Sequence, residues 1–183
     1  MRFNSIERLE QWKENQYPTI HDKIFDLIEE HMIGNSACDL CCSTGLLGQR
    51  IKTELNKNAI GIDVDKEALT NAKNFGINIP LFLCDIDADN PKPFMTILEE
   101  QGIDTLIARR CISEIFFKKI SSGVSFAKRL KETNVQQIFF QGRQVRANSN
   151  HPLKSVNEEI ALFQKDWKTV QHWGDCALLI RRK

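Results

Sequence analysis

Residues 37–48 read ACDLCCSTGLLG, and this stretch decides the fold. A short apolar run that contains Asp39 leads into a turn of small residues, and a helix is expected to begin at about Leu46. A second apolar run, AIGID at residues 59–63, ends in Asp63. The turn would bring backbone N–H groups and a helix N-terminus to a ligand, and the second acid would accept hydrogen bonds from ribose hydroxyls. Together these runs predict a nucleoside-binding unit of an open parallel sheet.

Strands and helices are expected to alternate from Ser36 onward. The expected strands are residues 37–41, 59–63, 81–84, 105–108 and 137–141. The expected helices between them are residues 46–55, 66–75, 94–101 and 124–131. Alternation of this kind predicts parallel strands with helices on both faces of the sheet.

The pattern changes after residue 141. A polar stretch at residues 142–152 leads into an amphipathic helix that carries Val156 and Ile160. Two further apolar runs then flank Gly174-Asp175, which is typical of a hairpin. A hairpin adds an antiparallel strand to an otherwise parallel sheet.

The first thirty-odd residues are expected to form two helices. Ile6, Leu9 and Trp12 fall at helical spacing, and a second helix is expected to open at Thr19 or His21 and to end at Gly34-Asn35. A chain of 183 residues fits one domain. We therefore expect a single domain over 1–183, with an N-terminal helical segment at 1–35 and the core at 36–183.

Composition excludes several classes of function. The formal net charge of +1 gives no overall field toward nucleic acid or membrane. No apolar run is long enough to span a bilayer, and the N-terminal residues lack the apolar region of a secretory signal. A cytoplasmic protein with no membrane partner is the expectation, and the oligomeric state is left open.

The six cysteines are expected to be mostly buried free thiols. Cys38 and Cys41 have the C-x-x-C spacing of zinc and redox sites, but no second pair with matching spacing follows. No metal is therefore expected, and a metal or redox role is the alternative interpretation. Cys111 lacks an evident supporting base, so a nucleophilic role is disfavoured.

The order of elements and the motifs resemble the class I S-adenosylmethionine-dependent methyltransferase family, over about residues 36–183. The resemblance implies a three-layer Rossmann-like α/β sandwich. Its sheet would be mostly parallel and seven-stranded, with one antiparallel strand near the C-terminus. The family pattern after the first strand is acid-x-Gly-x-Gly-x-Gly. Asp39 matches the acid and Gly45 the last glycine, while Cys41 and Ser43 stand in place of the first two glycines.

That departure matters because glycine allows positive φ and a close approach of the backbone to a ligand. Ser43 adds a Cβ near the place where the methionine part of the cofactor would lie. The resemblance nevertheless implies that Asp39, Cys41, Ser43 and Gly45 line the cofactor site.

Two further acids match the family. Asp63, with its neighbour Val64, ends the second strand where the family grips the ribose; Asp65 is the rival, but it can equally be a helix N-cap. Asp85 with Ile86 follows the third strand, where the family often holds the adenine amino group and ring. Asp87 is the less favoured substitute for Asp85.

The end of the fourth strand matches the family in position only. Arg109 and Arg110 stand there, and the resemblance makes Arg109 a candidate contact to cofactor or acceptor, able to hold a carboxylate or phosphate. The plainer alternatives are a solvent-exposed arginine or one paired with Glu114. The Asn/Asp-Pro-Pro-aromatic motif of amino-directed nucleic-acid methyltransferases is absent, which disfavours that chemistry.

The resemblance thus implies an enzyme that transfers a methyl group from S-adenosylmethionine. The acceptor stays open among RNA, a protein side chain and a small anionic molecule. The rival hypothesis is a binding or scaffolding protein that keeps the fold without catalysis, because two motif glycines are replaced. A nicotinamide-dependent oxidoreductase would share Asp63 but lacks G-x-G-x-x-G.

Overall fold

The structure, a computed structural model, describes residues 17–86, 90–117, 119–142, 153 and 155–183. The helix expected around Ile6–Trp12, the alternative acid Asp87 and nearly all of the polar stretch at 142–152 lie outside these residues. None of the helices in the described ranges is long and apolar enough to cross a membrane.

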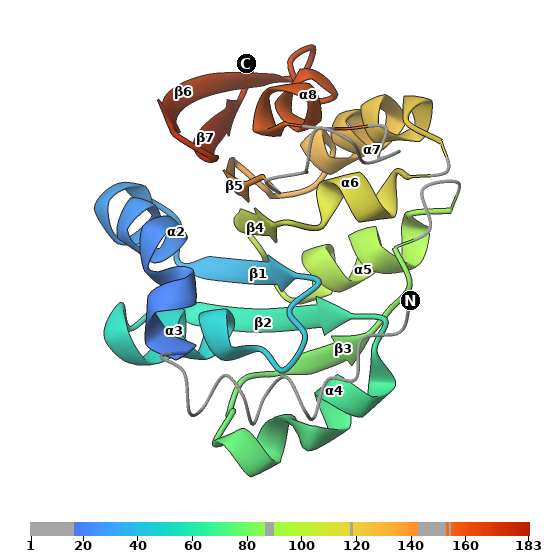
Figure 1. Cartoon of the computed structure of the whole chain (residues 1–183). Helices are drawn as coiled ribbons and strands as arrows, with labels where there is room; N and C mark the ends of the chain where they lie inside the picture. Colours follow the sequence, from blue (N-terminus) through green and yellow to red (C-terminus); the bar gives the residue numbers. More distant parts are fainter. Residues whose placement is uncertain (1–16, 87–89, 118, 143–152, 154) are drawn as a thin grey trace.

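Seven strands form a single sheet in the order β3-β2-β1-β4-β5-β7-β6 (Figure 1). Their bounds are β1 (Ser36–Leu40), β2 (Asn58–Asp63), β3 (Leu81–Leu83), β4 (Thr105–Arg109), β5 (Gln137–Gln141), β6 (Trp167–Trp173) and β7 (Cys176–Arg181). The first five strands pair in parallel, and β7 is antiparallel to both of its neighbours, β5 and β6. The expectation of a mostly parallel seven-stranded sheet with one reversed strand is confirmed.

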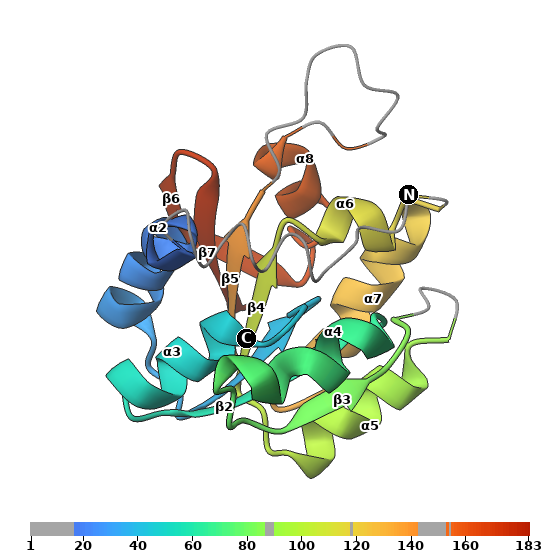
Figure 2. The same ribbon diagram turned by 60° about the horizontal axis from the view of Figure 1, so that its bottom comes forward.

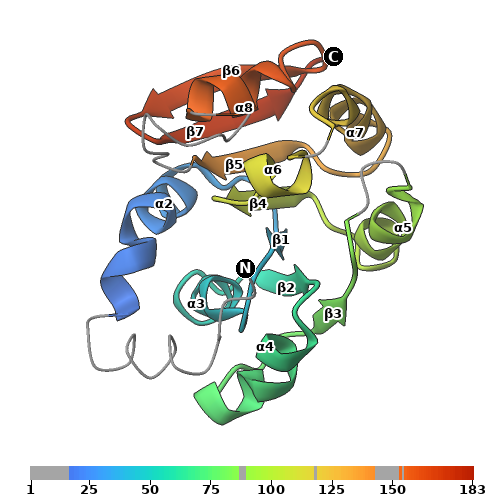
Figure 3. The ribbon, with the colours of Figure 1, turned by 45° about the vertical axis from the view of Figure 1, so that its right-hand side comes forward.

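The helices lie on both faces of the sheet (Figure 3). They are α2 (Tyr17–His31), α3 (Leu46–Glu54), α4 (Lys66–Asn71), α5 (Lys92–Glu100), α6 (Ile112–Ile115), α7 (Ser121–Lys131) and α8 (Val156–Ala161), with a 3₁₀ turn at Ala72–Phe75. Apolar residues of α2 and α3 cover one face, and those of α5, α7 and α8 cover the other. The result is the three-layer sandwich expected from alternation.

Side chains alternate between the two faces along β1. Cys38 and Leu40 enter the core under α5 and α7, while Ala37 enters the core under α2 and α3. Asp39 has the parity of Ala37, so it is directed to the α2–α3 side. The alternation therefore places one carboxylate inside the sandwich at the end of a central strand.

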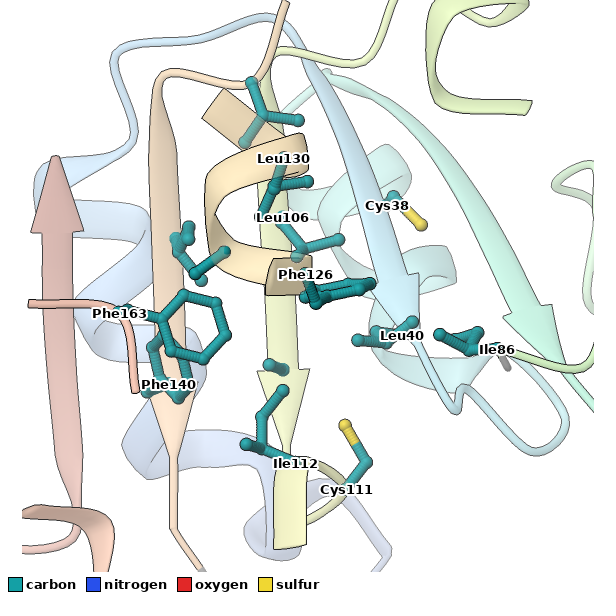
Figure 4. Packing of buried hydrophobic residues seen from close by; sticks show 14 of the residues in the cluster. Cys38, Leu40, Ile86, Leu106, Cys111, Ile112, Phe126, Leu130, Phe140 and Phe163 are labelled. Atoms are coloured by element: carbon teal, nitrogen blue, oxygen red, sulfur yellow. The ribbon is translucent and has the colours of Figure 1, made fainter. Parts of the chain in front are cut away.

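Phenylalanine rings fill the larger core. The ring centroids of Phe94 and Phe126 are 5.6 Å apart, and those of Phe140 and Phe163 are 5.0 Å apart. Figure 4 shows Phe126, Phe140 and Phe163 among aliphatic side chains of this core. Because close-packed interiors resist deformation, this core is a rigid support for the strand ends.

Several boundaries differ from expectation. The helix α2 begins at Tyr17 rather than at Thr19 or His21, and α7 begins at Ser121, three residues before the expected Val124. The expected helix at 66–75 is an α-helix that tightens into a 3₁₀ turn. The short helix α6 was not expected at all, because four residues are too few to show helical periodicity.

Candidate functional site

The candidate site lies at the carboxyl ends of β1 to β4 (Figure 2). The strand order places β1 between β2 and β4. The chain runs outward from β1 to β2 and β3 on one side, and then crosses back to β4 and β5 on the other side, so the strand order reverses beside β1. Ligands of open α/β sheets bind outside the carboxyl ends of the strands at such a switch point. Asp39, Asp63, Asp85 and Arg109 all lie at or just beyond these four ends.

The turn after β1 alternates left-handed residues. We call residues 41–45 the first turn; φ is +54° at Cys41, +54° at Ser43 and +81° at Gly45. A left-handed backbone costs a residue other than glycine about 1–2 kcal/mol. Positive φ at Cys41 and Ser43 means that both hold a conformation that glycine adopts without strain. The first turn therefore has a glycine-like backbone even though two of the family's glycines are replaced.

Asp63 holds the first turn in place. One of its carboxylate oxygens accepts a hydrogen bond from the Ser43 N–H at 2.7 Å, and the other accepts from the Asp65 N–H at 2.8 Å. Each carboxylate oxygen has a second lone pair, so Asp63 keeps capacity to accept from a ligand hydroxyl. The side chain of Asp65 caps α4 by accepting from the N–H groups of Glu67 and Ala68. The cap role foreseen for Asp65 is confirmed.

Asp39 is a buried acid, with 3% of its surface exposed. Burial raises its pKa to about 7, against the opposing effects of the Arg109 guanidinium and the Gly48 N–H, and the Asp63 carboxylate raises the pKa further. Asp39 pairs with Gly61 of β2 and Ile107 of β4, two residues before Asp63 and Arg109, so the three side chains share one face of the sheet. The structure thus brings together the acids of the first two strands and the arginine of the fourth.

The end of β3 is more open. Asp85 is exposed and Ile86 is buried. Val64 after β2 is 64% exposed, and Leu83 at the end of β3 is 57% exposed. Val64 and Leu83 are neighbours of the half-buried Asp63, and exposed aliphatic side chains in such a place are suited to the face of an apolar ring. The binding roles of Asp85, Ile86 and Val64 stay predictions.

The end of β4 carries positive charge. Arg109 is half-buried and Arg110 is exposed, with φ +55° and an N–H that donates to the Gln141 carbonyl at 2.7 Å. His21 of α2 is buried close by. Burial, then the charges of Arg109, Arg50 and Arg110, lower the pKa of His21 to about 3. The imidazole is therefore neutral at physiological pH, near three guanidinium groups.

Sequence reasoning missed several buried polar groups near these strand ends. The side-chain oxygens Thr44 Oγ1, Ser113 Oγ and Gln141 Oε1 are buried and have no hydrogen-bond partner among the described residues. Buried polar atoms without partners are costly, so in native proteins they often await a water or a ligand. Gln141 could have been found as the last residue of the expected fifth strand. Ser113 could not, because it belongs to the unexpected helix α6.

The cysteines are all free. Five are buried, and Cys41 in the first turn is half-buried. Within the described ranges, no group of three or more His, Cys, Asp or Glu side chains is placed to hold a metal ion.

No family model and no curated protein matches the sequence. Solved structures do share the fold. The sugar N-methyltransferase KedS8 from Streptoalloteichus sp ATCC 53650 superposes with a TM-score of 0.69 at 9% identity, over 97% of this chain and 93% of that one. The PH0226 protein from Pyrococcus horikoshii OT3 gives a TM-score of 0.68 at 10% identity, over 94% of both chains.

The bifunctional kinase-methyltransferase WbdD gives a TM-score of 0.63 at 14% identity, over 93% of this chain. The chain covers only 41% of WbdD, so the likeness concerns one part of that protein. Identities this low show the fold alone. The sheet order, the reversed β7 and these superpositions together show that the chain has the class I methyltransferase fold.

Proposed function

We propose that this protein is an enzyme, an S-adenosylmethionine-dependent methyltransferase. The observation that carries the proposal is the first turn, which has left-handed residues at Cys41, Ser43 and Gly45 and is fastened to Asp63 by the Ser43 N–H. Asp63 therefore keeps spare lone pairs for a ligand, and it lies beside the first turn at the switch point of the sheet.

The residues at the strand ends fit the parts of this cofactor. Asp63 would accept from the ribose hydroxyls, and the exposed Val64 with Ile86 would contact the adenine ring, with Asp85 near its amino group. Asp39 suits a cationic partner, because a buried carboxylate is stabilised by a positive charge beside it. The ammonium of the methionine part would supply that charge. Cys41, Ser43 and Gly45 would contact the same part through the backbone of the first turn.

S-adenosylmethionine, when bound, supplies a methyl group on a sulfonium that is already electrophilic. The protein's task is then to align an acceptor in line with that methyl group and to exclude water. No strong general base is needed unless the acceptor carries a proton that must leave early.

A small anionic molecule is the acceptor that the charges favour. Arg109 ends β4 and Arg110 follows it, near the neutral His21. A guanidinium there could bind a carboxylate or phosphate with two hydrogen bonds. The net charge of +1 provides no broad field for RNA. An acceptor held by these arginines would approach from the β4 side of the sheet.

Calorimetric titration with S-adenosylmethionine and S-adenosylhomocysteine tests the proposal. We expect micromolar binding by the native chain. Asp63→Ala should weaken it by about tenfold or more, because hydrogen bonds to a charged group contribute about 1.5–3 kcal/mol. The matched control is Asp65→Ser, two residues after Asp63. Serine keeps a side-chain oxygen that can cap α4. Asp65→Ser should bind as the native chain does.

The scaffolding hypothesis has one observation in its favour, the Cβ atoms that Cys41 and Ser43 carry in left-handed positions. Absence of binding at millimolar ligand, in a chain that unfolds cooperatively, would favour that hypothesis. Binding of a nicotinamide dinucleotide in place of S-adenosylmethionine would instead favour an oxidoreductase. Either result would overturn the proposal.

A further inference from the structure

Three short segments, far apart in the sequence, carry much of the chain's positive charge. They are residues 128–131 (KRLK), 165–168 (KDWK) and 181–183 (RRK), with eight basic residues and one acidic residue among them. The whole chain has 25 basic and 24 acidic residues, so 17 basic and 23 acidic residues remain outside these segments. The net charge of +1 is therefore the sum of a strongly basic part and an acidic remainder.

Hydrogen bonds join the three segments at one place in the fold. The Arg181 guanidinium donates to the carbonyl of Lys131 at 3.2 Å and to that of Thr133 at 2.9 Å. The Arg182 backbone N–H donates to the Asp166 carbonyl at 3.0 Å. The last segment thus contacts each of the other two. We call residues 128–131, 165–168 and 181–183 the basic cluster.

The basic cluster lies at the edge of the sheet opposite the candidate site. The helix α7 ends at Lys131, shortly before β5 begins at Gln137. The Arg181 N–H donates to the Gln136 carbonyl at 3.0 Å, and Arg181 pairs with Trp167, the first residue of β6. These contacts lie at the amino end of β5, and Figure 3 shows the C-terminus near α7. The candidate site lies at the carboxyl ends of strands parallel to β5, so the two surfaces are separate.

Most of these positive charges face solvent. Among the described residues, Lys131 is the only member of the basic cluster whose side chain is paired with an acid, Asp166, at 4.0 Å. Lys131 and Arg181 are half-buried, and six members are exposed: Lys128, Arg129, Lys165, Lys168, Arg182 and Lys183. The C-terminus of α7 favours nearby cations, but that effect does not explain the other two segments. Like charges on one surface repel each other, and a multivalent anion relieves the repulsion.

We propose that the basic cluster binds the phosphate backbone of a nucleic-acid duplex. Lysine and arginine neutralise phosphates without reading the base sequence. The single aromatic residue of the cluster, Trp167, is fully buried and is not available for stacking on unpaired bases, which favours a duplex over a single strand. The cluster has no exposed large apolar side chain to enter a lipid bilayer. RNA and DNA duplexes share the backbone chemistry, and the inference does not depend on the proposed function.

Fluorescence anisotropy with labelled RNA and DNA duplexes of one sequence tests the proposal. We expect the native chain to bind a duplex of about 20 base pairs with a dissociation constant of about 1–100 μM at physiological salt, the range of sequence-independent binding. The logarithm of the binding constant should fall linearly with the logarithm of salt concentration, with a slope of about −3 to −5, because each neutralised phosphate contributes about −0.9. The tighter of the two duplexes identifies the kind of nucleic acid.

A triple variant locates the binding surface. Lys128→Gln/Lys165→Gln/Lys168→Gln removes three exposed charges and keeps the hydrogen bonds of Arg181 and Arg182. This variant should bind either duplex about tenfold or more weakly at physiological salt, with a salt slope that is shallower by about 0.9 for each lost phosphate contact.

The charge-matched comparison is Lys66→Gln/Lys73→Gln/Lys92→Gln, which removes three exposed lysine charges from α4, the 3₁₀ turn and α5. This second variant should bind as the native chain does, and both variants should keep the native midpoint of urea unfolding. Equal losses of binding in the two variants would overturn the proposal.

Three results with the native chain alone would also overturn it, whether or not the variants fold. They are absence of duplex binding at low salt, tighter binding of a single strand than of the duplex, and binding of phosphatidylserine vesicles without binding of duplex. A chain that binds duplexes but no S-adenosylmethionine would refute the proposed function and leave this inference standing.

Discussion

Ser43 and Cys41 show how a single backbone angle can matter more than a side chain. Both residues have φ of +54°, and the Ser43 N–H is directed to Asp63. Strain that persists at a functional position is maintained by its surroundings, here by the bond to Asp63. Cys41 and Ser43 stand where the family pattern has glycine, but the backbone at both positions keeps the left-handed conformation that glycine adopts without strain.

Replacing Ser43 by glycine should therefore stabilise the protein. Relief of the left-handed strain, less the extra entropy of glycine in the unfolded chain, gives about 0.5–1 kcal/mol in the free energy of unfolding. Urea denaturation would measure the change.

The matched control is Ser125→Gly on the exposed side of α7, where glycine should destabilise by about 0.5 kcal/mol. The two serine-to-glycine changes should thus have opposite signs. A loss of stability in Ser43→Gly equal to that in Ser125→Gly would contradict the strain argument.

At the scale of elements, the contact between the first turn and β2 depends on a missing side chain. A Cβ at Gly61 would lie 2.6 Å from Cys42 Sγ and 2.7 Å from Leu81 Cδ2. Gly61 pairs with Asp39 on one side and with Leu81 on the other. A glycine in the middle of a strand usually marks such a close approach. Here it lets the first turn lie against β2, close to Asp63.

Gly61→Ala should lower the free energy of unfolding by about 1–3 kcal/mol, because extra volume in a packed site forces its neighbours to move. It should also weaken any ligand of the first turn. Thermal and urea unfolding together with the titration described above would measure both effects.

Gly102→Ala is the control, since Gly102 has φ of +60° but open space around its Cβ position. That change should cost about 1 kcal/mol from the backbone alone and leave ligand binding intact. A Gly61→Ala variant as stable as the native chain would show that the close approach of Cys42 and Leu81 to Gly61 does not contribute to stability.

The elements themselves were largely predictable from sequence. The expected strand at 137–141 is β5 without a shift, because apolar residues flanked by polar ones mark its ends. The reversed β7 followed from Gly174-Asp175 between two apolar runs, and Gly174 indeed has φ of +61°. Parallel topology followed from alternation, because a helix between two strands returns the chain to the same end of the sheet.

The site was predictable only where its residues follow strands. Asp39 lies in one apolar run and Asp63 ends the next, and the strand pairing directs both side chains to the same face of the sheet. The left-handed first turn was hidden, because glycine is the residue that signals positive φ and Cys41 and Ser43 are not glycine. His21 shares a helical face with Ile24 and Ile28 by spacing, which predicts burial. The position of His21 beside Arg109 depends on how α2 crosses the sheet, which the local sequence does not determine.

For the molecule as a whole, two buried groups near Arg109 should give opposite pH dependences of stability. The folded-state pKa of Asp39 is raised from 3.8 to about 7, so the folded chain holds more protons than the unfolded chain between these values. Stability from Asp39 is present below 3.8 and is lost as pH rises toward 7. The pKa of His21 is lowered from 6.5 to about 3, so stability is lost as pH falls from 6.5 toward 3.

Single substitutions should expose these two slopes. Relative to the native chain, Asp39→Asn should make the free energy of unfolding rise more steeply with pH over the shared interval, and His21→Gln should make it fall. Each substitution should change the slope of the free energy of unfolding against pH by the equivalent of one proton at most, or about 1.4 kcal/mol per pH unit. Urea unfolding at a series of pH values would measure it.

The double variant Asp39→Asn/His21→Gln should restore a slope close to that of the native chain. Single variants whose stability curves run parallel to the native curve would show that neither group titrates differently in the two states.

The position of β7 bears on how the chain folds as it is made. Synthesis produces β6 before β7, yet β7 is inserted between β5 and β6. A nascent chain on the ribosome can assemble β1 to β5, but the open edge of β5 must wait for the last strand to emerge, and β6 has no partner in the sheet until then. An uncovered strand edge invites pairing with other chains. The interval before β7 leaves the exit tunnel is thus when this protein is most exposed to misassembly and to capture by chaperones.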